Sequence, residues 1–137
     1  MKILVCTDFS TASAGGEREA ALRFPDATLV IFHAVDDGLL RVVAERTGQD
    51  KERLREEMTN YADTRVDEVV ARLRSQGKRA EADITAGEPA DAALAAARRH
   101  GVHLIVMGVR AGERVGRFRT RMVRESRTPV LIIPGES

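Results

Sequence analysis

Short, almost wholly apolar runs alternate along this chain with longer segments of helical periodicity. The apolar runs cover residues 2–7, 28–35, 102–107 and 129–133, and one further run, 79–85, alternates strictly between apolar and polar residues. Uninterrupted apolar runs are typical of parallel strands that are covered by helices on both faces. The pattern therefore predicts an α/β fold with a five-stranded parallel sheet, Rossmann-like in class, and it places the alternating run at a sheet edge.

The segments between the apolar runs carry helix signals. We expect a first helix that ends near Phe24, with further helices over residues 49–75, 90–100 and 114–126. Residues 36–38 (Asp-Asp-Gly) are expected to form a turn, and residues 39–48 fit either a loop or a short helix. Gly108 is expected to end the fourth strand.

Length and composition fit a single compact domain over residues 1–137. Hydrophobic residues make up 43% and charged residues 31%, which argues against intrinsic disorder. No apolar run approaches the roughly 18 residues of a membrane span, and the N-terminus lacks the features of a signal peptide. We therefore expect a cytosolic protein. One cysteine forms no internal disulfide, and no Cys/His set has zinc-site spacing.

The charge is balanced overall but not locally. The net charge of +1 does not point to nucleic acid or a membrane. Residues 110–127, however, contain seven arginines against the glutamates Glu113 and Glu125. On the predicted helix, Val115, Phe118 and Met122 share a face expected in the core. An adjoining stripe on this helix consists of Arg114, Arg117, Arg121 and Arg124. This arginine stripe is interpreted as a solvated face, as a phosphate site or as a surface for an acidic partner.

Two loops are expected to face one another where the strand order reverses, the place at which such sheets bind ligands. Residues 8–10 follow the first strand and residues 108–116 follow the fourth. Glycines let the backbone approach a ligand, and a helix start and arginines attract phosphate. The residue types therefore fit a nucleotide or phosphate site that includes Gly108, Gly112, Gly116, Arg110 and Arg117. Asp8 serves either as a ligand contact or as a helix cap.

Several motifs resemble the universal stress protein family across nearly the whole chain. The segment ILVCTDFS is similar to the family's first strand and Asp-x-Ser turn, and FHAVD is similar to the end of its second strand. The combination of GEPA, LIVMG and PVLIIP at these spacings is similar to its later elements. The resemblance implies a fold like that of the adenine nucleotide alpha hydrolases. It also implies a homodimer formed through the last strand, from Pro129 to Ile133.

One branch of this family binds ATP through the motif Gly-x2-Gly-x9-Gly-Ser/Thr after the fourth strand, and the other branch lacks both the motif and the activity. Here Gly108 matches the first glycine, while Ala111 stands at the second position with Gly112 one residue late. Gly116 matches the third glycine, Arg117 replaces the Ser/Thr, and the loop is five residues shorter.

If ATP with magnesium binds, the resemblance places Asp8 and Val35 near the adenine. It places Gly108, Ala111 and Gly116 near the ribose and phosphates. Cys6 is interpreted as a buried filler and His33 as a packed core or interface residue. No Ser-His-Asp, Cys-His or Gly-Lys-Ser/Thr pattern is recognisable.

Three functions remain open on the sequence. The first is a regulatory or protective module of the stress response without committed catalysis. The second is an ATP-binding switch, with slow hydrolysis, that uses the crevice between the ends of the first and fourth strands. The third is an interaction protein that holds an acidic partner through the arginine-rich last helix.

Overall fold

The computed structural model describes residues 1–112 and 114–135, so Glu113 and the last two residues lie outside the described part. Within the described residues, the strands are β1 (Lys2–Cys6), β2 (Thr28–Asp36), β3 (Arg79–Gly87), β4 (Leu104–Arg110) and β5 (Val130–Gly135). The helices are α1 (Thr11–Arg23), α2 (Asp37–Thr47), α3 (Lys51–Ser75), α4 (Pro89–His100) and α5 (Arg117–Glu125). The strands form one parallel sheet in the order β3-β2-β1-β4-β5, which confirms the predicted fold class.

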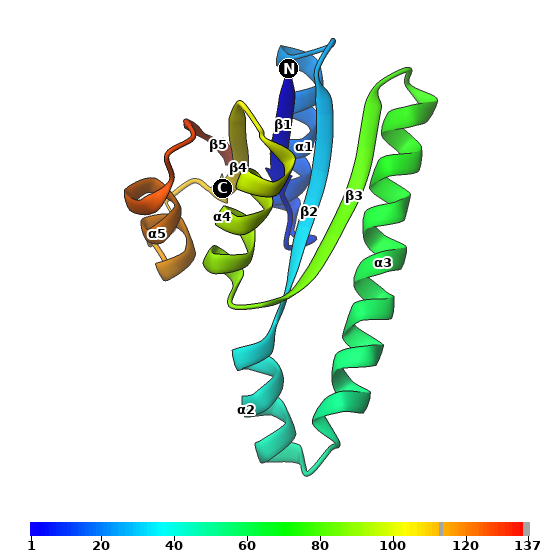
Figure 1. Ribbon diagram of the computed structural model, residues 1–137, viewed down its shortest axis with the longest axis vertical. Helices are drawn as coiled ribbons and strands as arrows, with labels where there is room; N and C mark the ends of the chain where they lie inside the picture. Colours follow the sequence, from blue (N-terminus) through cyan, green and yellow to red (C-terminus); the bar gives the residue numbers. More distant parts are fainter. Residues whose placement is uncertain (113, 136–137) are drawn as a thin grey trace.

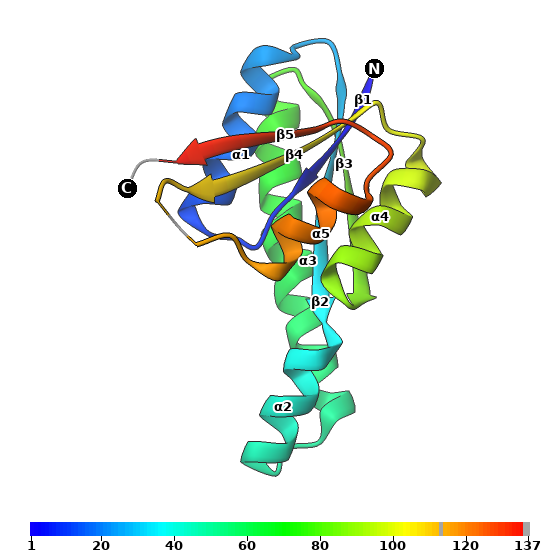
Figure 2. The ribbon, with the colours of Figure 1, turned by 90° about the vertical axis from the view of Figure 1, so that its left-hand side faces the viewer.

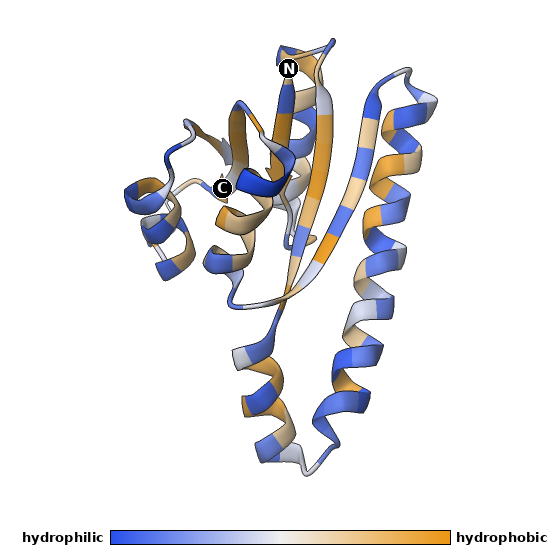
Figure 3. Ribbon diagram, viewed as in Figure 1, coloured by the Kyte–Doolittle hydropathy of each residue, from blue (hydrophilic) through white to orange (hydrophobic). Residues whose placement is uncertain are grey.

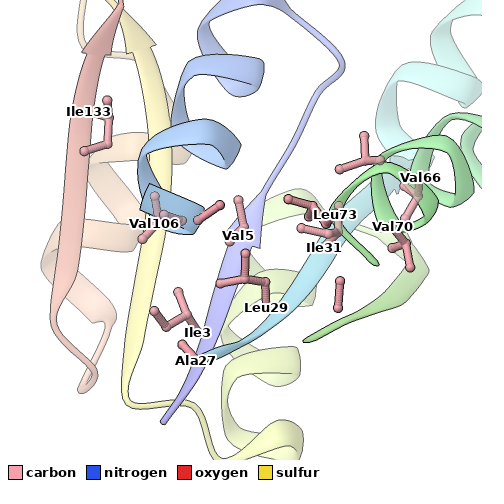
Figure 4. Close-up of a cluster of buried hydrophobic side chains, with 14 residues drawn as sticks. Ile3, Val5, Ala27, Leu29, Ile31, Val66, Val70, Leu73, Val106 and Ile133 are labelled. Atoms are coloured by element: carbon pink, nitrogen blue, oxygen red, sulfur yellow. The ribbon is translucent and has the colours of Figure 1, made fainter. Parts of the chain in front are cut away.

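Helices cover both faces of the sheet, as Figure 2 shows. On one face, α1 and α3 pack against Ile3, Val5, Leu29 and Ile31; Figure 4 shows this cluster. On the other face, α4 and α5 pack against the alternate residues of the same strands. Every buried position of α4 is an alanine, and these short side chains bring the helix close to the sheet. The two clusters explain why the central strands are apolar along most of their length.

The edge position of β3 is confirmed. This strand pairs with β2 alone in the described sheet, and its apolar and polar residues alternate in Figure 3, whereas β2 is apolar along most of its length. The opposite edge is β5, which pairs with β4. None of the described helices is long and apolar enough to cross a bilayer.

The predicted turn at residues 36–38 is wrong, because the chain continues directly from β2 into α2. Asp36 caps this helix by accepting a hydrogen bond from the backbone N–H of Leu39 at 3.1 Å. In Figure 1, α2 and the first half of α3 extend beyond the sheet as a helical hairpin. Arg55 of α3 joins the two helices through an ion pair with Asp37 at 2.9 Å.

The chain between β4 and α5 also differs from expectation. Gly108 does not end the fourth strand, because β4 continues to Arg110, which pairs with Gly135. The last helix begins at Arg117 rather than Arg114. Val115 therefore precedes the helix and is 66% exposed, although the helical spacing placed it in the core. Met122, from the same predicted face, is fully buried.

Candidate functional site

A cavity of about 340 Å³ lies at the carboxyl edge of the sheet. Its lining includes residues at the ends of β1, β2 and β4, so it spans the position where the strand order reverses. Its walls are mainly apolar: Leu39 comes from α2, Met58 from α3, Pro89 from α4 and Phe118 from α5. Hollows of similar volume over α3 and between α4 and α5 are lined mostly by exposed or charged side chains. The cavity at the sheet edge is therefore the best candidate for a small-molecule site.

Asp8 lines this cavity directly after β1. Its Oδ1 accepts hydrogen bonds from the Ser10 backbone N–H at 2.9 Å and from the Ser13 hydroxyl at 2.7 Å. Burial alone would raise the pKa of the Asp8 carboxyl, but these hydrogen bonds outweigh it and hold the pKa below its usual range. Asp8 does not cap α1, since the Ser10 side chain does so through the Ser13 N–H at 3.1 Å. The Asp8 side chain is therefore a fixed, ionised acceptor beside the cavity.

His33 lines the cavity from the neighbouring strand β2. Its Nδ1 donates a hydrogen bond to the backbone carbonyl of Thr7 at 2.8 Å. Because a carbonyl oxygen only accepts, Nδ1 carries the hydrogen, and in the neutral ring Nε2 is then an acceptor. The ring stacks on Phe9 with a centroid distance of 4.4 Å, and the Arg65 guanidinium lies 5.1 Å from the Phe9 ring. These contacts fix the ring orientation of His33.

Gly108 lines the cavity, but its neighbours give a different reason for glycine there. A Cβ added at Gly108 would lie 1.9 Å from the backbone oxygen of Ala12 in α1. One added at Gly16 would lie 2.9 Å from the Gly108 nitrogen. The two glycines therefore let α1 pack directly on β4. This packing requires glycine at position 108 independently of any ligand that approaches it.

The rest of the predicted glycine–arginine loop does not line the cavity. Arg110 ends β4, and Ala111 and Gly112 follow it in an exposed turn in which Gly112 has a φ of 79°. Gly116 and Arg117 begin α5 and are also exposed. None of these five residues therefore belongs to the lining of the cavity at the sheet edge.

The predicted adenine contact Val35 is also outside the lining, because its side chain is buried against Leu40 and Ala62. Its neighbours in β2, Ala34 and Asp36, line the cavity instead. Successive residues of a strand point to opposite faces, so the side chain of Val35 lies on the other face of β2 from those of Ala34 and Asp36.

The walls of the cavity are the part that sequence reasoning missed. Phe118 and Met58 appeared in helical patterns that predict burial in a core, and nothing in those patterns distinguishes a core contact from a cavity wall. Cys6 lines the floor, and burial raises the pKa of its thiol to about 12, which fits an unreactive filler. No group of three or more His, Cys, Asp or Glu side chains within residues 1–112 and 114–135 is arranged to hold a metal ion.

Arg121, in the predicted arginine stripe, is engaged within the fold. Its guanidinium forms ion pairs with Glu88 at 3.0 Å, with Asp91 at 2.7 Å and with Glu125 at 2.6 Å. The first two partners belong to the cap and first turn of α4, so Arg121 joins α5 to α4. The stripe is therefore partly neutralised from within the molecule.

Comparisons with known proteins agree with this fold. The model of the universal stress protein family matches residues 1–134. A search of curated protein sequences finds no match. Among solved structures, a universal stress protein from Burkholderia pseudomallei is similar, with a TM-score of 0.76 and 26% identity over 98% of this chain and 96% of that one.

Two similar structures were solved with nucleotides. One is a family protein from Arabidopsis thaliana with AMP bound, with a TM-score of 0.70 and 18% identity over 98% of this chain and 91% of that one. The other is a universal stress protein in complex with cAMP, with a TM-score of 0.61 and 22% identity over 97% of this chain and 95% of that one.

Proposed function

The chain belongs to the universal stress protein family, and we propose that it is a ligand-binding module of the stress response without committed catalysis. The proposed ligand is an adenine nucleotide or nucleoside, with its base in the cavity at the ends of β1, β2 and β4. The observation that carries the proposal is this cavity, in which apolar walls surround the ionised carboxylate of Asp8.

The chemistry of the cavity matches an adenine base. Adenine has two flat apolar faces and an exocyclic amino group that donates hydrogen bonds. Met58 and Phe118 supply apolar surface for the faces, and Asp8 supplies an acceptor for the amino group. Two proteins of similar fold were solved with AMP and with cAMP, which supports the choice of adenine ligands.

Binding is tested by calorimetric titration of the purified protein with AMP, after release and chromatography of any nucleotide that it retains. The variant Ala34→Phe adds a large ring to the lining and is expected to lower the affinity for AMP by about tenfold or more. The matched control is Ala71→Phe, because Ala71 is an exposed residue of α3 outside the lining. An AMP affinity that is unchanged in Ala34→Phe would place the ligand elsewhere. Hydrolysis of ATP at no more than the buffer rate is the expected result of the parallel assay.

We also propose that the protein forms a homodimer through β5. This strand is a sheet edge with partly buried apolar side chains, and exposed edges of this kind invite pairing. The Ile105 N–H donates to the Pro129 carbonyl at 2.9 Å, and Ile105 pairs with Val130. In a parallel ladder with this register, the backbone N–H groups of Val130 and Ile132 point away from β4.

The variant Ile132→Pro is expected to shift the protein from dimer to monomer in sedimentation velocity. Proline removes one outward donor and is tolerated at an edge position of this kind. Ile132→Ala is the control, because it shortens the side chain and keeps the N–H. A wild-type protein that sediments as a monomer would refute the proposed dimer.

A second candidate function is the binding of an acidic partner beside α5. A hollow of about 430 Å³ between α5 and β5 is lined by apolar residues, including Val123, which is 56% exposed, and by Arg119 and Arg124. An apolar floor between arginines suits an acidic segment with apolar side chains.

A labelled peptide of alternating glutamate and valine is the probe for this surface. Its binding is expected to weaken with added salt and to fall several-fold in Arg124→Glu, measured by fluorescence anisotropy. Arg53→Glu, on the exposed surface of α3, controls for the change in net charge. If the peptide binds equally well to Arg124→Glu and to Arg53→Glu, the surface beside α5 is not its binding site.

A further inference from the structure

The charges around the cavity are unlike those of a triphosphate site. Two carboxylates, those of Asp8 and Asp36, belong to the lining, and no lysine or arginine is found among the described lining residues. A phosphate chain carries negative charge and is normally held by cations, backbone N–H groups or a metal ion. The lining of the cavity carries negative charge, as a phosphate chain does. Electrostatic repulsion therefore opposes the binding of a phosphate chain there.

The hydrogen-bonding groups of the cavity are mainly acceptors. Asp8 is held in its ionised form by Ser10 and Ser13, and Asp36 accepts from the Leu39 N–H at 3.1 Å while it caps α2. His33 uses its Nδ1 hydrogen on the Thr7 carbonyl, so that hydrogen is not offered to a ligand. A set of acceptors is complementary to a ligand that donates, such as an amino group or sugar hydroxyls.

Apart from Gly108, the residues predicted to hold phosphates lie outside this lining. Gly108 borders the cavity, but its glycine character serves the packing of α1. Arg117 begins α5 and is exposed, while the next residue, Phe118, presents an aromatic ring to the cavity instead of the hydroxyl that the ATP-binding motif supplies near this position. The lining therefore offers a ligand mainly apolar and acidic surface.

We infer that the cavity selects an uncharged adenine nucleoside over nucleotides, with an affinity that falls as phosphates are added. This inference rests on the proposed function, since it specifies the ligand class of the same site. It makes the protein a sensor of nucleosides rather than of ATP. The order of affinity is adenosine first, AMP second and ATP last.

Calorimetric titration of the wild-type protein with adenosine, AMP and ATP, without magnesium and at one ionic strength, tests the order. We expect ATP to bind about tenfold or more weakly than adenosine, and added salt to narrow this gap because it screens the repulsion. ATP that binds as tightly as adenosine, or more tightly, overturns the inference and leaves the proposed function in place. If none of the three ligands binds, the proposed function fails and the inference fails with it.

The variant Asp36→Asn tests how the charge of the cavity lining affects ligand selectivity, because it hardly changes the shape of the lining. Asparagine keeps the capping oxygen of α2 but removes one negative charge from the lining, so the ratio of adenosine affinity to ATP affinity is expected to fall several-fold. Asp26→Asn is the control, because Asp26 is exposed before the amino end of β2, away from the carboxyl edge that bears the cavity. An unchanged ratio in Asp36→Asn, or an equal change in both variants, contradicts the electrostatic explanation.

Discussion

Replacing Gly108 by alanine is expected to destabilise the protein by about 3 kcal/mol, the upper part of the range for overpacked sites. The added Cβ would lie 1.9 Å from the Ala12 oxygen and 2.6 Å from the Ala12 carbonyl carbon, both in the backbone of α1. A backbone cannot rotate away as a side chain does, so α1 and β4 must separate. Their separation also disturbs the carboxyl edge, where Gly108 and Asp8 border the cavity.

Urea unfolding followed by far-UV circular dichroism measures this loss of stability. Gly116→Ala is the matched control, because an added Cβ at Gly116 meets open space and its φ of −87° suits any residue. Gly116 is the N-cap of α5, where alanine is a poorer cap than glycine, so the control is expected to cost about 1 kcal/mol or less. A Gly108→Ala protein as stable as Gly116→Ala would show that α1 does not pack on β4 as closely as described.

The contrast between these glycines shows that one sequence spacing can have several physical causes. The sequence contains Gly108, Gly112 and Gly116 at regular intervals, and that spacing suggested a phosphate-binding loop. In the fold, each has its own environment: Gly108 is packed on α1, Gly112 has a positive φ in a turn, and Gly116 precedes a helix. Spacing alone does not separate these causes, because each depends on contacts with distant residues.

The fold itself was accessible from the sequence because burial on both faces leaves a strong pattern. A central strand of a covered parallel sheet is apolar at nearly every position, and the run at 28–35 shows this, with Thr28 and His33 as its polar residues. The alternation of apolar and polar residues over 79–85 likewise predicted that this strand lies at an edge of the sheet. The boundaries around β4 and α5 were less accessible, because pairing with β5 decides where β4 ends.

Only some of the residues that line the cavity could be predicted from the sequence, because polar and apolar lining residues leave different sequence patterns. Asp8 was identified because it follows a strand end at the reversal of strand order. Phe118 and Met58 come from helices far apart in the chain, and their role depends on how α3 and α5 approach the sheet. The ion pairs of Arg121 were not predicted, because its acidic partners Glu88 and Asp91 lie 33 and 30 residues earlier in the chain.

Replacing Met122 by alanine is the second change with a large expected effect. Met122 is the one fully buried residue among the described residues of α5 and packs into the cluster beneath α4. Truncation of a buried methionine leaves a cavity and costs about 3 kcal/mol. The neighbouring variant Val123→Ala is expected to change stability by less than about 0.5 kcal/mol, because Val123 is 56% exposed. Urea unfolding of the two variants measures this difference.

The Met122 variant also tests how α5 contributes to ligand binding. Phe118 stands one helical turn before Met122 and lines the cavity, so loosening the anchor of α5 displaces one wall of the proposed adenine site. We therefore expect the affinity for adenosine to fall several-fold in Met122→Ala under conditions in which circular dichroism shows the variant to be folded. A folded Met122→Ala protein that keeps full affinity would mean that α5 is not a wall of the binding site. The selectivity between adenosine and ATP would then depend on Asp8 and Asp36 rather than on α5.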